Sequence, residues 1–345
     1  MADTQSELER LTNDYRARIA TMEMRATNVL GAAYVDVLAG LDARLTALET
    51  KIAERQAAGD PVNQSWLFQQ DRYREMIRQT RVLMGEYGQT VGMVTTAAQR
   101  AAVTGALIEA GLELAAVSGG SGETTQMVAG WAAISDSTIQ HMVGALQAST
   151  PLGELLSGFG PDAVKDVNRA LITGTAMGLS AQVMTREVVR ALGISRTRAE
   201  TIVRTEALRA ARGATIAAYE QSGVLQGWRW SASLSERTCP SCLSKHGQTF
   251  DLKTPMNSHP SCRCSASPWF GDGRDTDWES GDEWLSRQSA AVQQQVLGKE
   301  GATLFRSGQL RLSDYERTTT SSKWGTTVSS GGTGWAKQQA EKAGR

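Results

Sequence analysis

Apolar residues recur every three or four positions from residue 6 to residue 57 of the chain. This spacing places them on one face of an α-helix. The positions are Leu8, Leu11, Tyr15, Ile19, Met22, Ala26, Val29, Ala33, Val37, Leu41, Leu45, Leu48 and Ile52. The pattern predicts one long amphipathic helix, or two helices joined near Gly31 or Gly40. Gly59, Asp60 and Pro61 are expected to end it, because glycine and proline interrupt helical backbone.

The same spacing resumes at about residue 65 and continues to Tyr87, so residues 1–87 are predicted to form a long helical hairpin. Residues 88–178 are rich in Ala and Gly and are predicted to be a further helical region. Within this region, the run Ser-Gly-Gly-Ser-Gly at 118–122 is typical of a flexible connector.

Three helices are predicted where the helical spacing returns, over residues 161–177, 181–192 and 195–221. Ser180 and Ser195 are suited to cap the N-termini of the last two helices, because a serine hydroxyl accepts hydrogen bonds from free backbone amides. Gly193 and Gly223 are expected to end them. Beyond residue 223 the pattern changes to short strands and turns.

Residues 269–317 are predicted to be an acidic linker followed by a helix at 284–297. Acidic residues dominate the start of this segment, and apolar residues at helical spacing follow them. Residues 318–345 are rich in Thr, Ser and Gly, which predicts a flexible tail unless Trp324 and Trp335 dock onto a partner or pack on the chain itself.

Composition narrows the class of protein. Lys and Arg together number 36, as do Asp and Glu, so the net charge is zero, which excludes a polybasic protein of the histone type. The chain shows no apolar run of the roughly 18–20 residues that a membrane span requires, and its polar start does not resemble a signal peptide. These features predict a soluble chain made in a reducing compartment.

All four cysteines lie close together, in two pairs with two histidines between them. The order is Cys239-x2-Cys242, then His246, then His259-x2-Cys262-x-Cys264. In a reducing compartment such clusters favour a metal site over disulfides. Zn²⁺ suits sulfur and imidazole ligands in a tetrahedral arrangement. We predict Cys239, Cys242 and His259 as three ligands.

Either Cys262 or Cys264 is expected to supply the fourth ligand, and His246 is expected to be a loop residue. A catalytic zinc ion would need an open coordination position and an adjacent acid or base. Glu236 and Asp251 are near in sequence, but nothing in the sequence shows that they face the ion, so a structural ion is favoured. Reduced cysteines without a metal, or two disulfides in an extracellular particle, are the alternatives. The predicted fold is therefore mainly α-helical, with a small α+β domain at residues 179–268 that zinc holds together.

Charge is distributed unevenly along the neutral chain. Residues 186–263 contain twelve Lys and Arg against six Asp and Glu, and the tryptophans next to Arg229 offer stacking surfaces. We therefore consider Arg204, Arg209, Arg212 and Arg229 as contacts to nucleic acid. In the alternative interpretation, the helical arginines pair with glutamates such as Glu200 and Glu206.

Several motifs follow one another in an order typical of one protein family. They are Arg204-Thr-Glu206, Trp230, Arg237-Thr-Cys-Pro-Ser-Cys242, Gly247 and His259-Pro-Ser-Cys-Arg-Cys264. Over residues 180–265 the chain resembles the head-morphogenesis, or minor head protein, family of tailed bacteriophages, which is similar to phage Mu protein F. Glu236 departs from the pattern, in which Asp is common, but the cysteines are intact.

The resemblance implies a non-enzymatic virion protein that acts in assembly of the head. It implies association with the portal protein and with major capsid or scaffolding proteins, contact with double-stranded DNA, and a place in the capsid interior after synthesis in the host cytoplasm. One alternative is a DNA-binding protein ejected with the genome. Another is a zinc-containing nuclease or toxin-type enzyme, although the paired Gln5-Ser-Glu7 expected of an ADP-ribosyltransferase lies only at the extreme N-terminus.

Overall fold

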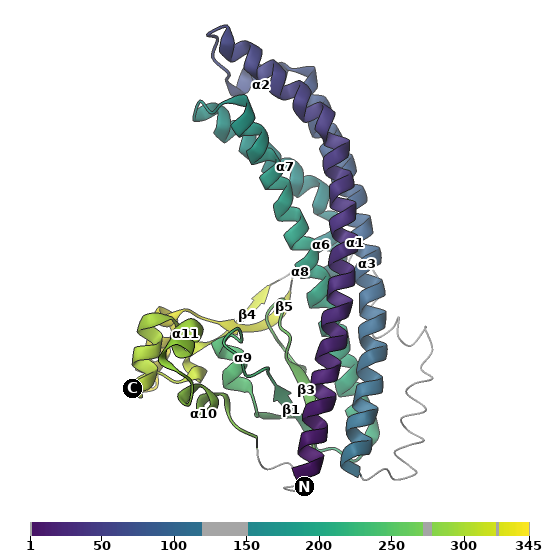
Figure 1. The fold of residues 1–345 in the computed structure, drawn as a ribbon, viewed down its shortest axis with the longest axis vertical. Helices are drawn as coiled ribbons and strands as arrows, with labels where there is room; N and C mark the ends of the chain where they lie inside the picture. The colour runs from purple at the N-terminus through teal and green to yellow at the C-terminus, as the bar shows by residue number, and fades with distance from the viewer. Residues whose placement is uncertain (1, 119–150, 272–277, 322–323, 345) are drawn as a thin grey trace. The chain divides into compact units, whose positions relative to one another are not determined.

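The computed structural model describes residues 2–118, 151–271, 278–321 and 324–344 (Figure 1). The chain divides into two compact units. Unit 1 contains Met1–Thr21, Gln99–Gly144 and Thr205–Arg345, and unit 2 contains Met22–Ala98 and Ala145–Arg204. The five consecutive segments expected from the sequence divide the chain differently, and their boundaries stay a prediction.

Two long helices occupy the N-terminal third of the chain, α1 (Ala2–Ala57) and α3 (Asp71–Ser118). The helix α1 is continuous through Gly31 and Gly40, so the alternative with two helices is wrong. It ends just before Gly59, whose φ of 77° lies in the left-handed region that glycine adopts readily. The predicted connector at 118–122 lies, apart from Ser118, outside the described residues.

The helices α1 and α3 pack against each other within each unit. In unit 2, a Cβ atom on Gly40 would lie 2.8 Å from Cδ1 of Leu83, so glycine allows α3 to approach closely. Arg72 also donates a hydrogen bond of 3.1 Å to the carbonyl of Ala47. The short helix α2 (Gln64–Gln69) joins the two, and the side chain of Asn63 caps its N-terminus.

Three further helices follow in the described chain: α6 (Pro151–Ser157), α7 (Phe159–Ala176) and α8 (Ala181–Ser222). The predicted break at Gly193 and Ser195 is wrong, because α8 is a single helix of 42 residues. An interior glycine costs a helix only about 1 kcal/mol, whereas Leu192 and Ile202, on either side of this position, are fully buried. Packing therefore outweighs the local preference.

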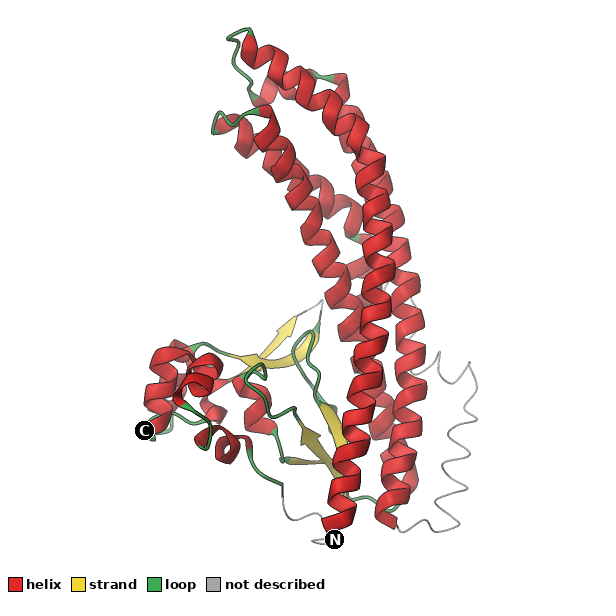
Figure 2. Cartoon of the chain, viewed as in Figure 1, coloured by secondary structure: helices red, strands yellow, loops and turns green. Residues whose placement is uncertain are grey.

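Strands occur only after α8 in the described residues (Figure 2). The strands β1 (Gly227–Ser231), β2 (Thr249–Asp251) and β3 (Ser265–Trp269) form an antiparallel sheet in the order β2-β1-β3. Trp228 pairs with Phe250 across β1 and β2, and their rings stack at 4.5 Å. The strand β1 precedes the segment with the first two cysteines, β2 follows that segment, and β3 follows the segment with the last two cysteines.

The remaining elements lie in unit 1. They are α9 (Pro240–Lys245), α10 (Gly281–Ser286), α11 (Ala290–Arg306), the 3₁₀ helix η1 (Leu312–Tyr315), β4 (Glu316–Ser321), β5 (Gly325–Ser330) and α12 (Thr333–Lys342). The helix predicted at 284–297 is thus two helices, because Ser289 caps a new N-terminus by accepting a hydrogen bond from the amide of Val292.

The described residues of the C-terminal tail form two strands and a helix, in line with the alternative in which a tryptophan packs on the chain itself. The strands β4 and β5 form an antiparallel hairpin of Thr-rich strands, and the β-branched Thr side chain suits extended backbone. The indole nitrogen of Trp335 donates a hydrogen bond of 3.1 Å to the carbonyl of Glu316. A small apolar core, which includes Leu243, Leu285 and Tyr315, joins α9, α10, α11, η1 and α12.

Candidate metal centre

The first two cysteines lie at the start of the short helix α9. Cys239 is its N-cap residue, and Pro240 takes the first helical position, where the missing N–H and the fixed φ suit a helix start. The amide of Cys242 donates a hydrogen bond of 3.0 Å to the carbonyl of Cys239. This single turn holds the two cysteines in a fixed relation to each other.

The other three side chains come from the segment that leads into β3. Between His259 and Cys262 the backbone turns sharply at Ser261, whose φ of 62° is left-handed. The amide of Ser261 donates a hydrogen bond of 2.9 Å to the hydroxyl of Thr205 on α8. Thr205 is the central residue of the Arg-Thr-Glu motif, so this motif positions the returning loop.

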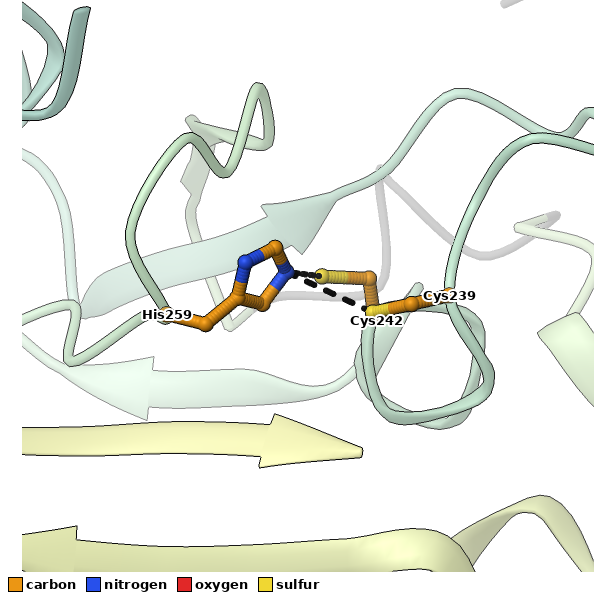
Figure 3. A group of neighbouring side chains, drawn as sticks. All are labelled: Cys239, Cys242 and His259. Carbon is orange, nitrogen blue, oxygen red and sulfur yellow. Dashed lines mark hydrogen bonds between the residues drawn. The ribbon is translucent and has the colours of Figure 1, made fainter. Parts of the chain in front are cut away.

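The two segments bring sulfur and imidazole groups together (Figure 3). Nε2 of His259 lies 3.4 Å from Sγ of Cys239 and 3.3 Å from Sγ of Cys242. Sγ of Cys242 lies 3.7 Å from Sγ of Cys262. Nδ1 of His259 lies 2.8 Å from the carbonyl oxygen of Pro260, so Nδ1 can donate there and leave Nε2 for the sulfurs.

The ligand atoms form two overlapping groups that could each hold a metal ion. Cys239, Cys242 and His259 make the first group, and Cys242, Cys262 and Cys264 make the second. Within each group all ligand atoms lie within 4.8 Å of one another. Cys242 belongs to both groups. The five predicted side chains therefore form one cluster around Cys242.

The pKa values of Cys239 and His259 are both shifted toward the charged form of the side chain. Hydrogen bonds with Cys242 and with His259 lower the pKa of the Cys239 thiol to about 4. Hydrogen bonds with Cys239 and Cys262 raise the pKa of His259 to about 10. A thiolate beside an imidazolium results at neutral pH. A metal ion would compete with these protons, because only thiolate and neutral imidazole bind a metal.

A buried arginine organises the returning loop from α8. Arg212 is 7% exposed and donates hydrogen bonds to the carbonyl oxygens of Cys262 and Cys264 and to the hydroxyl of Ser258. Its guanidinium thus provides hydrogen bonds to the backbone carbonyls of two of the cysteines themselves. The sequence analysis selected Arg212 as a contact to nucleic acid, and its burial argues against that role.

The hairpin β4–β5 supports the other side of the cluster. The hydroxyl of Ser330 accepts a hydrogen bond of 2.8 Å from the amide of Ser241. Glu316 accepts hydrogen bonds from Ser244 and from Lys245, at 2.7 and 2.9 Å. The sequence analysis missed these residues, because Ser330 and Glu316 lie far along the chain in or next to the segment predicted to be flexible.

His246 lies outside the two ligand groups, in agreement with its expected placement outside the site. Its Nδ1 accepts a hydrogen bond of 3.0 Å from the amide of Ala232. Burial, with further contributions from Arg16 and Arg229, lowers the pKa of His246 to about 4. The ring is therefore neutral at physiological pH.

The other three arginines considered for nucleic acid also have partners within the protein. Arg204 forms an ion pair of 3.0 Å with Glu23. Arg209 pairs with Glu206 at 3.1 Å and donates to the carbonyl of Trp324. Arg229 is 7% exposed and lies over the ring of Trp278, with 5.1 Å between the guanidinium carbon and the ring centroid. The pairs of Arg204 and Arg209 with glutamates match the alternative of internal pairing, whereas Arg229 is on a strand and contacts an aromatic ring.

Comparison with known families identifies part of the chain. Residues 165–267 match the model of the family described as Phage Mu protein F like protein. The match confirms the resemblance predicted for residues 180–265, and it contains the whole Cys/His cluster. No curated protein and no solved structure matches the chain. Among the described helices, none is both long enough and apolar enough for a membrane span.

Proposed function

We propose that the chain, whose residues 165–267 form a phage Mu protein F-like domain, is a minor head protein that acts in head assembly of a tailed phage. The family match is the observation that carries this proposal. In this role the protein associates with the portal protein inside the procapsid, next to major capsid or scaffolding proteins. It is made in the host cytoplasm, remains in the capsid interior and has no enzymatic activity.

The Cys/His cluster serves this role as a structural zinc site. Cys239, Cys242, His259 and Cys262 are the proposed ligands, because Nε2 of His259 lies within 3.4 Å of the sulfurs of Cys239 and Cys242, and Sγ of Cys262 lies 3.7 Å from Sγ of Cys242. Neither Cys262 nor Cys264 is in the group that contains His259, so variants of these two cysteines decide between them. Four N and S ligands suit tetrahedral Zn²⁺, which supplies folding free energy to a domain whose sheet has only three strands.

Metal analysis of the purified chain tests the ligand set. We expect one zinc ion per chain in the wild-type protein and in Cys264→Ser, and well below one in Cys262→Ser. The two variants make a matched pair, since both cysteines are buried and lie two residues apart. Full zinc retention in Cys262→Ser, or loss in Cys264→Ser, would overturn the proposed set. Absence of zinc from the wild-type protein would overturn the metal site itself.

Co-purification tests the assembly role. The tagged full-length chain is expressed during infection, and procapsids are isolated and dissociated. We expect the portal protein to be recovered with the tagged chain. When the portal gene is silent and the other head proteins are present, we expect the tagged chain to recover none of them. Recovery of scaffold or capsid protein without portal protein would contradict portal association. Absence of the chain from procapsids would contradict a head protein.

A second candidate function is contact with double-stranded DNA, which the positive charge of residues 186–263 favours. Of the four arginines considered, Arg209 has the most exposed side chain, at 42%. We expect the full chain to bind duplex DNA with an affinity that falls as salt rises, and Arg209→Gln to reduce that salt dependence. Binding no stronger than that of a neutral control protein would remove this function.

A further inference from the structure

A second polar site lies in unit 1, outside the Cys/His cluster. It is a pocket of about 380 Å³ between α1, the end of β1 and the segment at residues 278–279. Its polar lining consists of Thr12, Asn13, Arg16, Ser231, His246 and Glu279, with Trp278 beside them. None of these residues belongs to the ligand groups.

Arg16 is held firmly in the wall of the pocket. Its Nη2 donates to the hydroxyl of Ser231 at 3.0 Å, and its Nη1 lies 3.4 Å from Oδ1 of Asn13. Its Nε is buried and has no hydrogen-bond partner among the described residues. A buried donor without an acceptor costs free energy unless a ligand or water satisfies it.

His246 supplies a second donor. Because its Nδ1 accepts the amide proton of Ala232, the neutral ring carries its own proton on Nε2. The described residues provide no acceptor for that Nε2–H, although the side chain is only 8% exposed. Burial is the main cause of the low pKa of His246, and the positive charges of Arg16 and Arg229 lower it further.

Glu279 is the one carboxylate in the described lining. It forms an ion pair with Arg287, which offsets its negative charge. Arg229 lies over one part of the Trp278 ring system, and the His246 ring lies 5.2 Å from that of Trp278. Among the described lining residues, Arg16 carries a positive charge, and the carboxylate of Glu279 is already paired.

We propose that this pocket binds a phosphate-type oxyanion, held by the guanidinium of Arg16 and by Nε2–H of His246. Guanidinium groups form strong, charge-assisted hydrogen bonds with phosphate, and imidazole N–H adds a directed donor. The amide nitrogen of Asn13 is a further donor in the lining. The phosphate is either a free oxyanion or the terminal phosphate of a nucleic acid.

Titration of His246 by NMR tests the proposal on the full-length, metal-loaded chain. Inorganic phosphate is added at constant ionic strength, with chloride as the balancing anion, and the His246 ring signal is identified by its loss in His246→Gln. We expect a saturable shift of this signal and a rise of the His246 pKa by at least one unit, because a bound anion favours the imidazolium. A signal that does not respond to phosphate would overturn the proposal.

Two arginine variants on the same helix separate binding from general charge effects. Arg16→Gln is expected to weaken phosphate binding at least tenfold. Arg10→Gln removes the same charge from an exposed residue that pairs with Glu7 and Asp14, and it should change binding less than twofold. Equal weakening in both would overturn the site. The wild-type titration decides the question alone if Arg16→Gln does not fold.

Oligonucleotides distinguish the source of the phosphate. A short single strand with a 5′ phosphate is compared with the same strand carrying a 5′ hydroxyl, each added to the phosphate-loaded protein. Displacement of phosphate by the phosphorylated strand alone supports a nucleic-acid end as the ligand. Displacement by neither strand, with phosphate still saturable, supports a free oxyanion. Equal displacement by both strands would contradict recognition of a terminal phosphate.

Discussion

The two units of the chain bury different kinds of side chain. The interior of unit 2 is mainly apolar and belongs to long helices, as Leu30, Met76 and Phe159 illustrate with no exposed surface. The interior of unit 1 also contains Glu113 and Arg212, together with three buried cysteines. Apolar burial supplies most of the stability of the first kind of interior, whereas the buried polar groups that are more frequent in the second kind each need a specific partner.

This difference predicts where each unit is vulnerable. Unit 2 should lose stability in proportion to the apolar volume removed, and it should be insensitive to metal and to pH. Unit 1 should depend on the metal ligands and on the protonation of its buried acids. Four predictions test this contrast, beginning with the largest effect.

Metal removal is expected to have the largest effect, and to act on unit 1 alone. Structural zinc sites supply about 10–16 kcal/mol in zinc-finger peptides, more than most domains have as total stability. Cys242→Ser removes the residue shared by both ligand groups. Hydrogen exchange should become fast in β1, β2 and β3 and stay slow in α7. Unchanged protection of the sheet in metal-free protein would refute a structural ion.

Truncation of Phe159 is expected to have the next largest effect, on unit 2. Its ring is fully buried and lies edge-on to Tyr87 at 5.8 Å. Phe159→Ala should lower the free energy of unfolding of unit 2 by about 3–5 kcal/mol, with the zinc content unchanged. Phe68→Ala is the control, because Phe68 is 39% exposed and its loss leaves a smaller cavity. Urea unfolding followed by helicity measures both, and equal losses would contradict the prediction.

Glu113 makes unit 1 sensitive to pH. Burial raises the pKa of this carboxyl to about 8, although Tyr219 and Thr12 donate hydrogen bonds to it. The folded state therefore keeps a proton that the unfolded state releases near pH 4.5, so stability falls as pH rises from about 4.5 to 8. Between pH 6 and 8 the expected loss is about 2 kcal/mol, since each pH unit corresponds to roughly 1.4 kcal/mol and the folded state itself begins to release the proton near pH 8.

The variant Glu113→Gln keeps the shape of the side chain and removes its titration. It should abolish most of the loss of stability between pH 6 and 8, measured by urea unfolding at both values. The remaining slope is expected to come from Glu109, whose pKa burial raises to about 7. Glu54→Gln, at an exposed position in unit 2, is the control and should leave the slope unchanged. An unaltered slope in Glu113→Gln would assign the pH dependence to other groups.

The contrast between the units also explains what the sequence could predict. Periodic apolar positions identified α1 and the first part of α3, up to Tyr87, because one helix face is buried there. The same reasoning placed a false break at Gly193, where a local cost of about 1 kcal/mol is smaller than the gain from packing. Apolar spacing and glycine positions therefore predicted the helices correctly only where tertiary packing favoured the same helix ends.

The metal centre was predictable in part for a similar reason. The spacing of cysteine and histidine selected the five members of the cluster, since the residue types that bind zinc can be recognised in the sequence. The supporting residues were not predictable, because Arg212 and Ser330 reach the cluster from distant parts of the chain. Arginine in a basic segment suggests a solvent-exposed phosphate contact, and only the fold reveals that this one hydrogen-bonds backbone carbonyls.

The smallest predicted effect tests whether all of unit 1 depends on the metal. The helix α10 begins with a capping box, in which Ser280 accepts a hydrogen bond of 3.2 Å from the amide of Glu283 and its own amide donates 2.7 Å to the Glu283 carboxylate. Ser280→Ala should cost about 1 kcal/mol, because the amide of Glu283 at the start of the helix loses its side-chain acceptor. Ser286→Ala, at the other end of the same helix, should be nearly neutral.

The zinc content should stay the same in both serine variants, because α10 packs in the small apolar core around Leu285 rather than on the ligands. Thermal unfolding and metal analysis measure the two quantities together. A parallel loss of zinc in Ser280→Ala would show that this core and the metal centre unfold as one. If zinc is retained at lower stability, the C-terminal part of unit 1 relies on helix caps and apolar packing, as unit 2 does, and metal dependence is confined to the sheet and its cysteine loops.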